Sequence, residues 1–420
     1  MNTKQVKLGS LCTITSSKRI FESEYVEEGI PFYRSKEIIE RESGKTTSSN
    51  IHITKERYNE IKEKFGVPKP NEMLITSVGT LGVPYIVKDN DLFYFKDGNL
   101  TWLKNFSKAL NSRYLYYWIK SDFGKQSLVQ RAIGSSQPAI TIDILKKYQI
   151  LIPDIIYQNK IVSVLSIYDD LIEKNNRKIE IFQDMAEELY KEWFVRFRFP
   201  GYKTAKFTDG IPDGWETKPL SEWLVDNFNG GWGEEVSTQK TPYKAFVIRG
   251  TDIENVKNAI IDDVPHRYHK LNDLNTKMLK ENDIVLELSN GNINNIGRTL
   301  FVNKQILNWF DKVMCASFCK TLRFEDRETA FLIWQYINYL QNSGLMLYYK
   351  NTGANGINNF NFKRFLKMPI SIPRHLNCTN DLIEYYDAIS LLSETNYNLR
   401  RQRDLLLPRL MSGKLAVKVS

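Results

Sequence analysis

A long helix with a heptad pattern is the feature that most constrains how this chain folds. Between residues 158 and 199, seam positions recur at alternating steps of four and three residues. This spacing places two positions in every seven on one stripe, which is the pattern of a coiled-coil seam. The helix cannot bury this stripe against itself, so it needs a partner helix. The stripe consists of Ile161, Leu165, Tyr168, Ile172, Asn175, Ile179, Phe182, Ala186, Leu189 and Trp193.

A second long helix is predicted between residues 380 and 407, and it also keeps heptad spacing. Each seam has one asparagine near its middle, Asn175 in the first helix and Asn396 in the second. A polar residue inside a seam lowers stability but fixes the register of the helices. We therefore expect antiparallel pairing with both asparagines in one layer, and we expect Pro408 and Gly413 to end the second helix. Its two stripes are Leu382, Ile389, Asn396, Arg403 and Leu410, and Tyr385, Leu392, Leu399 and Leu406.

The two halves of the chain repeat each other. Residues 31–38 resemble 246–253, with Arg34 aligned to Arg249, and residues 150–153 resemble 370–373. The offset stays between about 211 and 220 positions, which is too long for a solenoid repeat and indicates duplication of a whole domain. The predicted fold class is α+β, with two mixed domains, two long antiparallel coiled-coil helices and a pseudo-twofold internal repeat. The predicted segments are a first domain at 1–155, a helix at 156–200, a second domain at 201–377 and a helix at 378–420.

Composition and charge narrow the class of protein only slightly. The chain has 420 residues, is 42% hydrophobic and carries a formal net charge of +9. These values fit folded domains that can contact a polyanion, although many basic proteins bind none. No long apolar run resembles a signal peptide or a membrane span, so we expect a cytoplasmic protein. The four cysteines show no metal-binding spacing, and Cys315 and Cys319 are expected to be buried thiols.

None of the candidate catalytic motifs has the residue spacing that its chemistry requires. Residues 44–46 resemble the end of a phosphate-binding loop, but the glycine required earlier in that loop is absent. His266 and His269 have no evident third ligand, so a surface loop is the better interpretation. The acidic residues Asp213 and Glu216 share a glycine-broken linker, which does not separate them as nuclease chemistry requires. We expect no active site and no metal site in this chain.

Several short motifs, each weak by itself, follow one another in an order that is repeated in the second half of the chain. This order resembles that of one protein family. The first copy reads Gly-Ser-Ser-Gln-Pro-Ala-Ile at 134–140, Ile-Leu-Ile-Pro at 150–153 and Gln-Asn-Lys-Ile at 158–161. The C-terminal segment at 406–415 reads Leu-Leu-Pro-Arg-Leu-Met-Ser-Gly-Lys-Leu. Over essentially its whole length the chain resembles the specificity subunit of type I restriction-modification systems. The second copy lacks the Ser-Ser-Gln-Pro residues at 353–357, so the two loops need not have equal roles.

This resemblance implies a DNA reader that is not itself an enzyme. Each domain would be a target recognition domain for one half of a bipartite sequence, and the helix pair would set the unread spacer. The same helices would dock two methyltransferase subunits, and restriction subunits would join in the full complex. Adenine-N6 methylation and ATP-dependent cleavage would belong to those partners. The chain itself would need no cofactor, while S-adenosylmethionine, ATP and Mg²⁺ would be bound by the partner subunits.

Residues for DNA contact are predicted from loops that mix basic and small polar side chains. Arginine and lysine suit guanine or phosphate, whereas asparagine and glutamine suit adenine. For each residue the alternative is an ordinary solvated turn, and the paired Arg34 and Arg249 could instead form structural salt bridges. The candidates are Ser17, Lys18, Arg19, Arg34, Lys36, Thr76, Ser77, Ser135, Ser136, Gln137, Arg249, Thr251, Asn290, Asn292, Asn294, Asn355 and Asn358.

Two other classes of function stay open at this point. The chain could be a non-catalytic coiled-coil scaffold whose end domains bind proteins and do not read DNA. It could also be a nuclease with an unrecognised site. A steep salt dependence of binding to a specific duplex favours the DNA reader over the scaffold. Cleavage of duplex DNA by the purified chain with Mg²⁺ would favour the nuclease.

Overall fold

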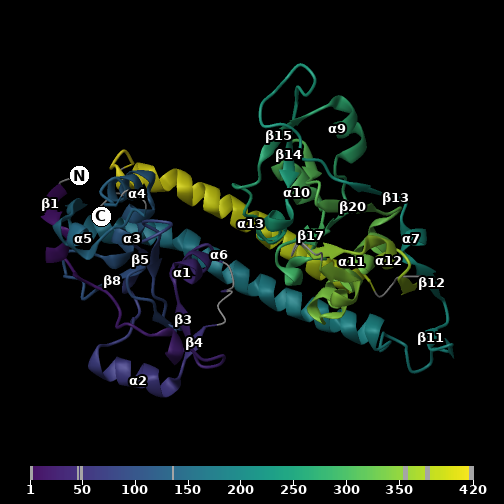
Figure 1. Ribbon diagram of the computed structural model, residues 1–420, viewed down its shortest axis with the longest axis horizontal. Coiled ribbons are helices and arrows are strands. Elements are labelled where there is room, and N and C mark those ends of the chain that lie inside the picture. Colours follow the sequence, from purple (N-terminus) through teal and green to yellow (C-terminus); the bar gives the residue numbers. More distant parts are fainter. Residues whose placement is uncertain are drawn as a thin grey trace. The chain divides into compact units, whose positions relative to one another are not determined.

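The computed structural model describes residues 3–44, 47, 51–134, 137–352, 358–373 and 379–415. Its backbone contacts divide the chain into two units, Met1–Asp170 with Arg400–Ser420, and Leu171–Leu399. Both long helices, α6 (Ile155–Tyr190) and α13 (Asn380–Met411), continue through this division (Figure 1). The units differ from the four predicted segments because each unit keeps the part of each long helix that packs against its own domain.

The first unit holds a mixed domain built around a four-stranded antiparallel sheet in the order β2-β8-β5-β6. A second sheet has the order β4-β3-β7, in which β3 and β7 are parallel. The elements are β1 (Thr3–Lys7), β2 (Thr13–Thr15), β3 (Ile30–Tyr33), α1 (Ser35–Glu42), β4 (His52–Ile53), α2 (Lys55–Lys64), β5 (Met73–Thr76), β6 (Pro84–Ile86), β7 (Tyr94–Phe95), β8 (Leu100–Lys104), α3 (Ser112–Lys120), α4 (Asp122–Val129), α5 (Ile142–Lys147) and β9 (Gln149–Pro153).

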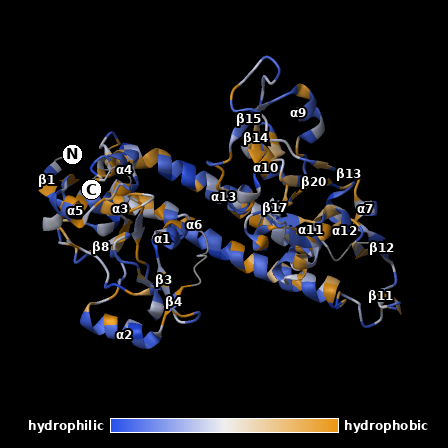
Figure 2. Ribbon diagram, viewed as in Figure 1, coloured by the Kyte–Doolittle hydropathy of each residue, from blue (hydrophilic) through white to orange (hydrophobic). Residues whose placement is uncertain are grey.

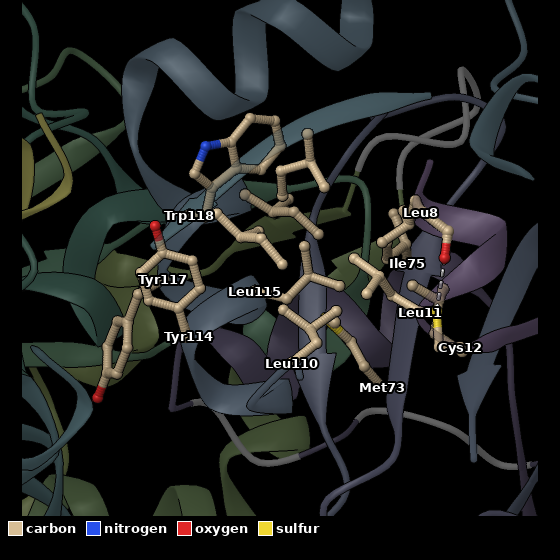
Figure 3. Packing of buried hydrophobic residues seen from close by; sticks show 14 of the residues in the cluster. Leu8, Leu11, Cys12, Met73, Ile75, Leu110, Tyr114, Leu115, Tyr117 and Trp118 are labelled. Carbon is tan, nitrogen blue, oxygen red and sulfur yellow. Dashed lines mark hydrogen bonds between the residues drawn. The ribbon is translucent and has the colours of Figure 1, made fainter. Parts of the chain in front are cut away.

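The core of the first unit lies between the four-stranded sheet and the helices. Figure 3 shows Leu115 of α3 among apolar side chains that include Met73 and Ile75 of β5. The Cys12 thiol donates to the Leu8 carbonyl oxygen at 3.7 Å, drawn as a dashed line. Burial raises the pKa of this thiol to about 12, so Cys12 is an inert core residue. Ile161 and Leu165 of α6 complete the same core together with Leu407 and Leu410 of α13.

The second unit repeats the two sheets of the first unit strand for strand. Its four-stranded sheet has the order β13-β20-β16-β18, and its three-stranded sheet has the order β15-β14-β19 with β14 and β19 parallel. The elements are β10 (Phe207–Thr208), β11 (Ile211–Pro212), β12 (Trp215–Pro219), α7 (Leu220–Trp223), β13 (Asp226–Asn229), β14 (Tyr243–Ile248), α8 (Ile253–Lys257), β15 (His266–His269), α9 (Leu271–Lys277), β16 (Ile284–Glu287), β17 (Ser289–Asn290), β18 (Thr299–Phe301), α10 (Lys304–Trp309), β19 (Val313–Cys315), β20 (Cys319–Arg323), α11 (Arg327–Asn342), β21 (Lys350–Thr352), β22 (Asn358–Phe360), α12 (Phe362–Phe365) and β23 (Pro369–Pro373).

The internal repeat predicted from the sequence is confirmed by the strand pairing. The first domain is closed by β1 against β9, where Thr3 pairs with Pro153. The second is closed by β12 against β23, where Trp215 pairs with Pro373. Both pairs are antiparallel and end on the proline that precedes a long helix. The second domain has a small sheet, β17-β22-β21, where the first domain has isolated antiparallel bridges of Ala139 with Val78 and with Ile133. This sheet was not predicted.

The two long helices pair antiparallel, as predicted. In the first unit, the start of α6 shares a core with the end of α13, and Asp169 accepts a hydrogen bond from Arg403. In the second unit, Phe182 of α6 packs against Tyr385 near the start of α13, with ring centroids 5.9 Å apart. Figure 2 shows hydrophobic residues recurring between hydrophilic ones along both helices, which is the amphipathic pattern that the heptads require.

Burial follows the predicted seams closely. On α6, Ile161, Leu165, Ile172, Ile179, Ala186 and Trp193 are buried, and Tyr168, Asn175, Phe182 and Leu189 are half-buried. On α13, Leu382, Asn396, Arg403 and Leu410 are buried, and Tyr385, Ile389, Leu392, Leu399 and Leu406 are half-buried.

The end of α13 corrects one expectation. The helix continues past Pro408 to Met411. Pro408 removes the backbone donor that would bond the carbonyl oxygen of residue 404, yet the helix runs on for three more residues. Gly413, with φ of 72°, ends the helix instead, and its N–H donates to the Leu410 carbonyl oxygen at 3.2 Å.

Candidate nucleic-acid interface

The two equivalent arginines start equivalent helical turns. The Arg34 backbone N–H donates to Glu37 Oε2 at 2.8 Å, and its guanidinium donates to Oε1 at 2.8 Å. In the second copy, the Arg249 N–H donates to Asp252 Oδ2 at 2.9 Å, and its guanidinium binds both carboxylate oxygens. Burial alone would raise the pKa of Glu37, but the hydrogen bonds from Arg34 outweigh it and hold the pKa below its ordinary value. Both arginines therefore form structural ion pairs, with guanidiniums that are still partly exposed.

Two predicted contacts of the first domain share one hollow. Lys36 and Gln137 both line a pocket of about 420 Å³ at the ends of β3 and β5. The Lys36 side chain is 63% exposed and lies 3.7 Å from the Glu40 carboxylate, a weak i,i+4 pair. We call this group the first loop cluster, and its lining residues are Ser35, Lys36, Ile39, Glu40, Val78, Gly79, Thr80, Asn99 and Gln137.

Two predicted contacts, Thr76 and Ser77, form hydrogen bonds inside the first domain. Both residues are buried at the end of β5. The Thr76 hydroxyl donates to the Thr80 carbonyl oxygen and accepts from the Val83 N–H, and the Ser77 hydroxyl bonds the Thr101 hydroxyl at 2.6 Å. These hydroxyls shape the turn after β5. Small polar residues at a strand end can serve the turn itself, and a DNA contact of Thr76 or Ser77 stays a prediction.

The three predicted contacts at 17–19 differ in whether their side chains are accessible. The Ser17 hydroxyl oxygen is buried without a hydrogen-bond partner, so it is not presented to a ligand. Lys18 and Arg19 are exposed. The Lys18 ammonium lies 5.2 Å from the Phe65 ring centroid, and Arg19 Nε donates to Asp97 Oδ2 at 2.8 Å. Of these three residues, the two cations can reach a phosphate.

A buried ion pair supports the loops of the second domain. Glu287 ends β16 and accepts from Arg298 Nε at 2.9 Å and from Asn290 Nδ2 at 2.7 Å. Arg298 also donates to the Gly250 carbonyl oxygen at 3.0 Å, which ties the turn after β14 to the same place. A Cβ atom at Gly250 would lie only 2.0 Å from Glu287 Oε1, so this close approach requires glycine.

The predicted asparagines of the second domain mostly build their own loop. The Asn290 side-chain oxygen accepts from the Asn292 N–H at 2.8 Å, and the Asn292 side-chain oxygen accepts from the Asn294 N–H at 3.0 Å. The amide of buried Asn358 donates to the Gly291 carbonyl oxygen at 3.2 Å. Asn294 and Thr251 are exposed at the same edge. Ser135, Ser136 and Asn355 lie outside the described residues.

These two edges belong to a duplicated fold with a recognisable relative. Residues 2–183 match the family model described as the type I restriction modification DNA specificity domain. The first half of this chain is similar to type I DNA specificity domains. The sequence resemblance to type I specificity subunits is therefore confirmed.

Full-length relatives of this specificity domain are similar over part of their length. The Haemophilus influenzae protein S.HindORF215P, named as a type I restriction enzyme specificity subunit, is 28% identical over 198 residues, 46% of this chain and 48% of that protein. The Methanocaldococcus jannaschii type I restriction enzyme MjaIX specificity subunit is 31% identical over 189 residues, 42% of each chain. The matched region thus spans about half the length of these curated relatives.

A solved structure shows the same fold over the whole chain. The crystal structure of the type I restriction-modification system S subunit from M. genitalium matches with a TM-score of 0.52 and 13% sequence identity. The match covers 100% of this chain and 97% of that one. At this identity the match establishes the fold, an α+β arrangement of two domains and long helices, as predicted.

Two further residues lie at these loop edges and were not among the predicted contacts. Asn99 lines the first loop cluster, and Phe318 occupies the turn between β19 and β20 with its side chain 70% exposed. The turn at 96–99 reads Lys-Asp-Gly-Asn and was not selected, although it mixes a basic residue with small polar ones, whereas the turn at 316–318 reads Ala-Ser-Phe and has no basic residue. The internal repeat, extended from strands to the turns between them, would have found both.

Several expectations about other chemistry can be set beside the structure. Cys315 and Cys319 are fully buried, as predicted. His269 is buried while His266 is exposed, so the two imidazoles do not share a surface loop as expected. Across the described part of the chain, no three histidine, cysteine or acidic residues gather as a metal site requires. None of its helices combines the length and apolar character needed to cross a bilayer.

Proposed function

We propose that this chain is the non-catalytic DNA-reading subunit of a type I restriction-modification complex. Each domain reads one half of a bipartite duplex sequence, and the antiparallel helix pair sets the unread spacer. The observation that carries the proposal is the duplication of the domain. The sheet order, the register of the closing strands and the arginine that starts a helical turn each occur twice. The first copy matches a DNA specificity domain. A bipartite target is the natural ligand of two reading units in one chain.

The loop edges supply the chemistry that reading requires. Phosphate contacts give affinity, and contacts to base edges give sequence information. The first loop cluster offers the exposed cation Lys36 beside the amides of Gln137 and Asn99. The second domain offers Thr251 and Asn294 on a loop held in shape by buried Glu287 and Arg298. A rigid scaffold under exposed polar loops is the usual construction of a recognition site.

Docking of methyltransferase subunits is assigned to the outer faces of the long helices. Ile181 and Met185 of α6 lie one turn apart outside the seam and are about half exposed, and Leu391 of α13 is also exposed. Apolar side chains at this spacing on a helix face suit a helical or grooved partner surface. Methylation of adenine with S-adenosylmethionine and ATP-dependent cleavage with Mg²⁺ are assigned to partner subunits, and the location is proposed to be cytoplasmic.

Selection from a randomised duplex pool tests the central proposal. The full-length chain, alone and with its methyltransferase subunits, should enrich a two-part motif with a fixed gap, and binding should weaken steeply with salt. Enrichment of no motif, with binding only to proteins, would support the scaffold instead. Cleavage of duplex DNA by the chain alone with Mg²⁺ would contradict the non-catalytic assignment.

A paired variant tests the docking surface separately. Ile181→Asp with Met185→Asp should abolish co-purification with the methyltransferase while the chain stays folded. The matched control is Glu180→Gln with Asp184→Asn, which changes neighbouring exposed positions of the same helix. Retained co-purification in the Asp variant would move the docking surface elsewhere.

A further inference from the structure

The turns that hold Asn99 and Phe318 are equivalent positions of the repeat. In the first domain the Ser77 N–H donates to the Asn99 carbonyl oxygen at 2.8 Å. In the second domain the Leu288 N–H donates to the Phe318 carbonyl oxygen at 2.9 Å. Each of these bonds directly follows the last residue pair of the strand ladder. That pair is Thr76 with Leu100 in the first domain and Glu287 with Cys319 in the second. The same backbone position therefore carries an amide in one domain and a phenyl ring in the other.

The surroundings of the two turns are also equivalent. In the first domain the Ile140 N–H donates to the Ser77 carbonyl oxygen at 2.9 Å, directly after the loop that contains Gln137. In the second domain the Phe360 N–H donates to the Leu288 carbonyl oxygen at 2.8 Å. Asn99 and Phe318 thus stand beside the same crossing strand, at the edge where the predicted contacts gather. An exposed ring at this place contributes little to the core, because 70% of its side chain remains in solvent.

We propose that Phe318 specifies a thymine in the half-site read by the second domain, through apolar contact with the 5-methyl group in the major groove. Asn99 takes the corresponding position in the first half-site, where its amide suits adenine. This inference rests on the proposed function and adds to it the residue that makes the two domains read different bases. The charge around the turn supports a DNA contact. Lys320 follows Phe318 by two positions, and the Ala316 N–H donates to the carbonyl oxygen of Ile248, the neighbour of Arg249, at 2.9 Å. The carboxylate of Glu287 is paired with Arg298 and so does not repel phosphate.

The chain offers a matched control for Phe318. Val225 is 64% exposed in the same domain, and its N–H donates to the Arg323 carbonyl oxygen at 2.9 Å. Arg323 ends β20, and Phe318 immediately precedes the start of that strand. Val225→Ala and Phe318→Ala therefore each remove an exposed apolar side chain, at opposite ends of one strand.

The test uses the duplex that the full-length chain selects from a randomised pool, with each thymine of the second half-site replaced in turn by deoxyuridine, which lacks the methyl group. For the wild-type chain, one replacement should weaken binding about fourfold, the factor that corresponds to one buried methyl group. Phe318→Ala should weaken binding to the parent duplex and lose sensitivity to that replacement only. Val225→Ala and Asn99→Ala should keep the wild-type sensitivity to that replacement. Asn99→Ala should instead reduce base specificity at one position of the first half-site.

Each outcome decides the matter. If Phe318→Ala and wild type respond equally to every deoxyuridine, the thymine contact is wrong. If Phe318→Ala weakens all duplexes equally, the ring acts as a non-specific wedge and the inference is also overturned. If the wild-type chain selects no duplex, it is the proposed function that fails. If Phe318→Ala abolishes capture of a partner protein and leaves DNA binding unchanged, the turn is a protein contact.

Discussion

Asn175 and Asn396 lie 221 positions apart in the chain and form one hydrogen bond, Asn175 Nδ2 to Asn396 Oδ1 at 2.9 Å. Asn396 Nδ2 returns to the side-chain oxygen of Asn176 at 2.8 Å. Asn396 is only 1% exposed, so its amide depends on these partners. One heptad further along α13, Arg403 pairs with Asp169 of α6. Two polar layers therefore interrupt otherwise apolar seams, and each layer fixes which positions of α6 and α13 face each other.

Removing the asparagine layer tests whether it determines register. Asn396→Leu alone should lower the free energy of unfolding by about 1 kcal/mol, because the Asn175 and Asn176 amides lose their partner. Asn175→Leu with Asn396→Leu should recover that stability or exceed it, since both positions then match the apolar seam. Urea unfolding of the wild type, both single variants and the double variant measures the coupling.

The register itself needs a second measurement on the same proteins. Cysteines placed at Ser393 and Lys178 of the facing helices, followed by cross-linking, report one heptad alignment against slipped ones. The double leucine variant should cross-link in more than one alignment, whereas Leu391→Ala, an exposed change on α13, should not. A single unchanged cross-link in the double variant would show that apolar packing alone sets the register.

The Asp169 layer links the helices to the first domain. Asp169 accepts from Arg403 and from the Tyr117 hydroxyl of α3. Burial alone would lower the pKa of Arg403, but Asp169 and Asp404 outweigh it and raise the pKa above its ordinary value. Arg403→Met should cost about 3 kcal/mol of unfolding free energy, because Asp169 is left as a largely unpaired charge. Chemical denaturation measures this loss.

Two further variants separate charge from packing at this layer. Arg403→Met with Asp169→Asn should recover part of the loss, because no charge then remains unpaired. Asp404→Asn should change stability by less than about 1 kcal/mol, since Asp404 is an exposed partner. Equal losses for Arg403→Met and Asp404→Asn would mean that the buried pair has no special role.

The heptad seams and the internal repeat could be predicted from the sequence, whereas the hydrogen bonds of individual side chains could not. The seams were predicted because every third or fourth residue must meet one partner, a rule that depends on spacing alone. A structural salt bridge of Arg34 was left open as an alternative without a named partner, since an arginine at a strand end can serve either DNA or a helix start. The sequence did not show that the Thr76 hydroxyl bonds within a turn. Phe318 was not selected as a contact because an apolar side chain carries no polar signal. Whether such a side chain is available for contact depends on its burial and on which turns lie side by side. Both depend on the tertiary fold.

His269 makes stability depend on pH. Burial lowers the pKa of this imidazole below its ordinary value of 6.5, and its Nε2 atom has no hydrogen-bond partner. The unfolded chain therefore binds a proton more readily than the folded chain as pH falls through 6.5, and stability contributed by neutral His269 is lost in that direction. The unfolding free energy of the wild type should fall between pH 7.5 and 5.5. In His269→Gln this fall should be shallower, and in His266→Gln, at an exposed position, it should match the wild type. Parallel profiles for all three proteins would assign the fall to other groups.

Arg34 and Lys36 are two residues apart, and the structure gives them different roles. Arg34 neutralises the buried carboxylate of Glu37, while Lys36 extends into solvent beside the first loop cluster. Arg34→Gln should therefore destabilise the first domain by about 2 kcal/mol, because Glu37 loses its charged partner. Lys36→Gln should leave stability unchanged and weaken duplex binding across sequences, with the slope of log affinity against log salt reduced by about one.

Measuring both properties on both variants separates the two roles. Thermal unfolding gives stability, and filter binding from 50 to 200 mM salt gives the slope. Lys55→Gln is the control for the salt series, because Lys55 is an exposed lysine at the start of α2, away from the residues that line the hollow. An unchanged slope in Lys36→Gln would remove Lys36 from the interface. A lower slope in Arg34→Gln at a temperature where the variant is fully folded would show that the half-exposed guanidinium also contacts phosphate, so that one residue serves both the helix start and the DNA.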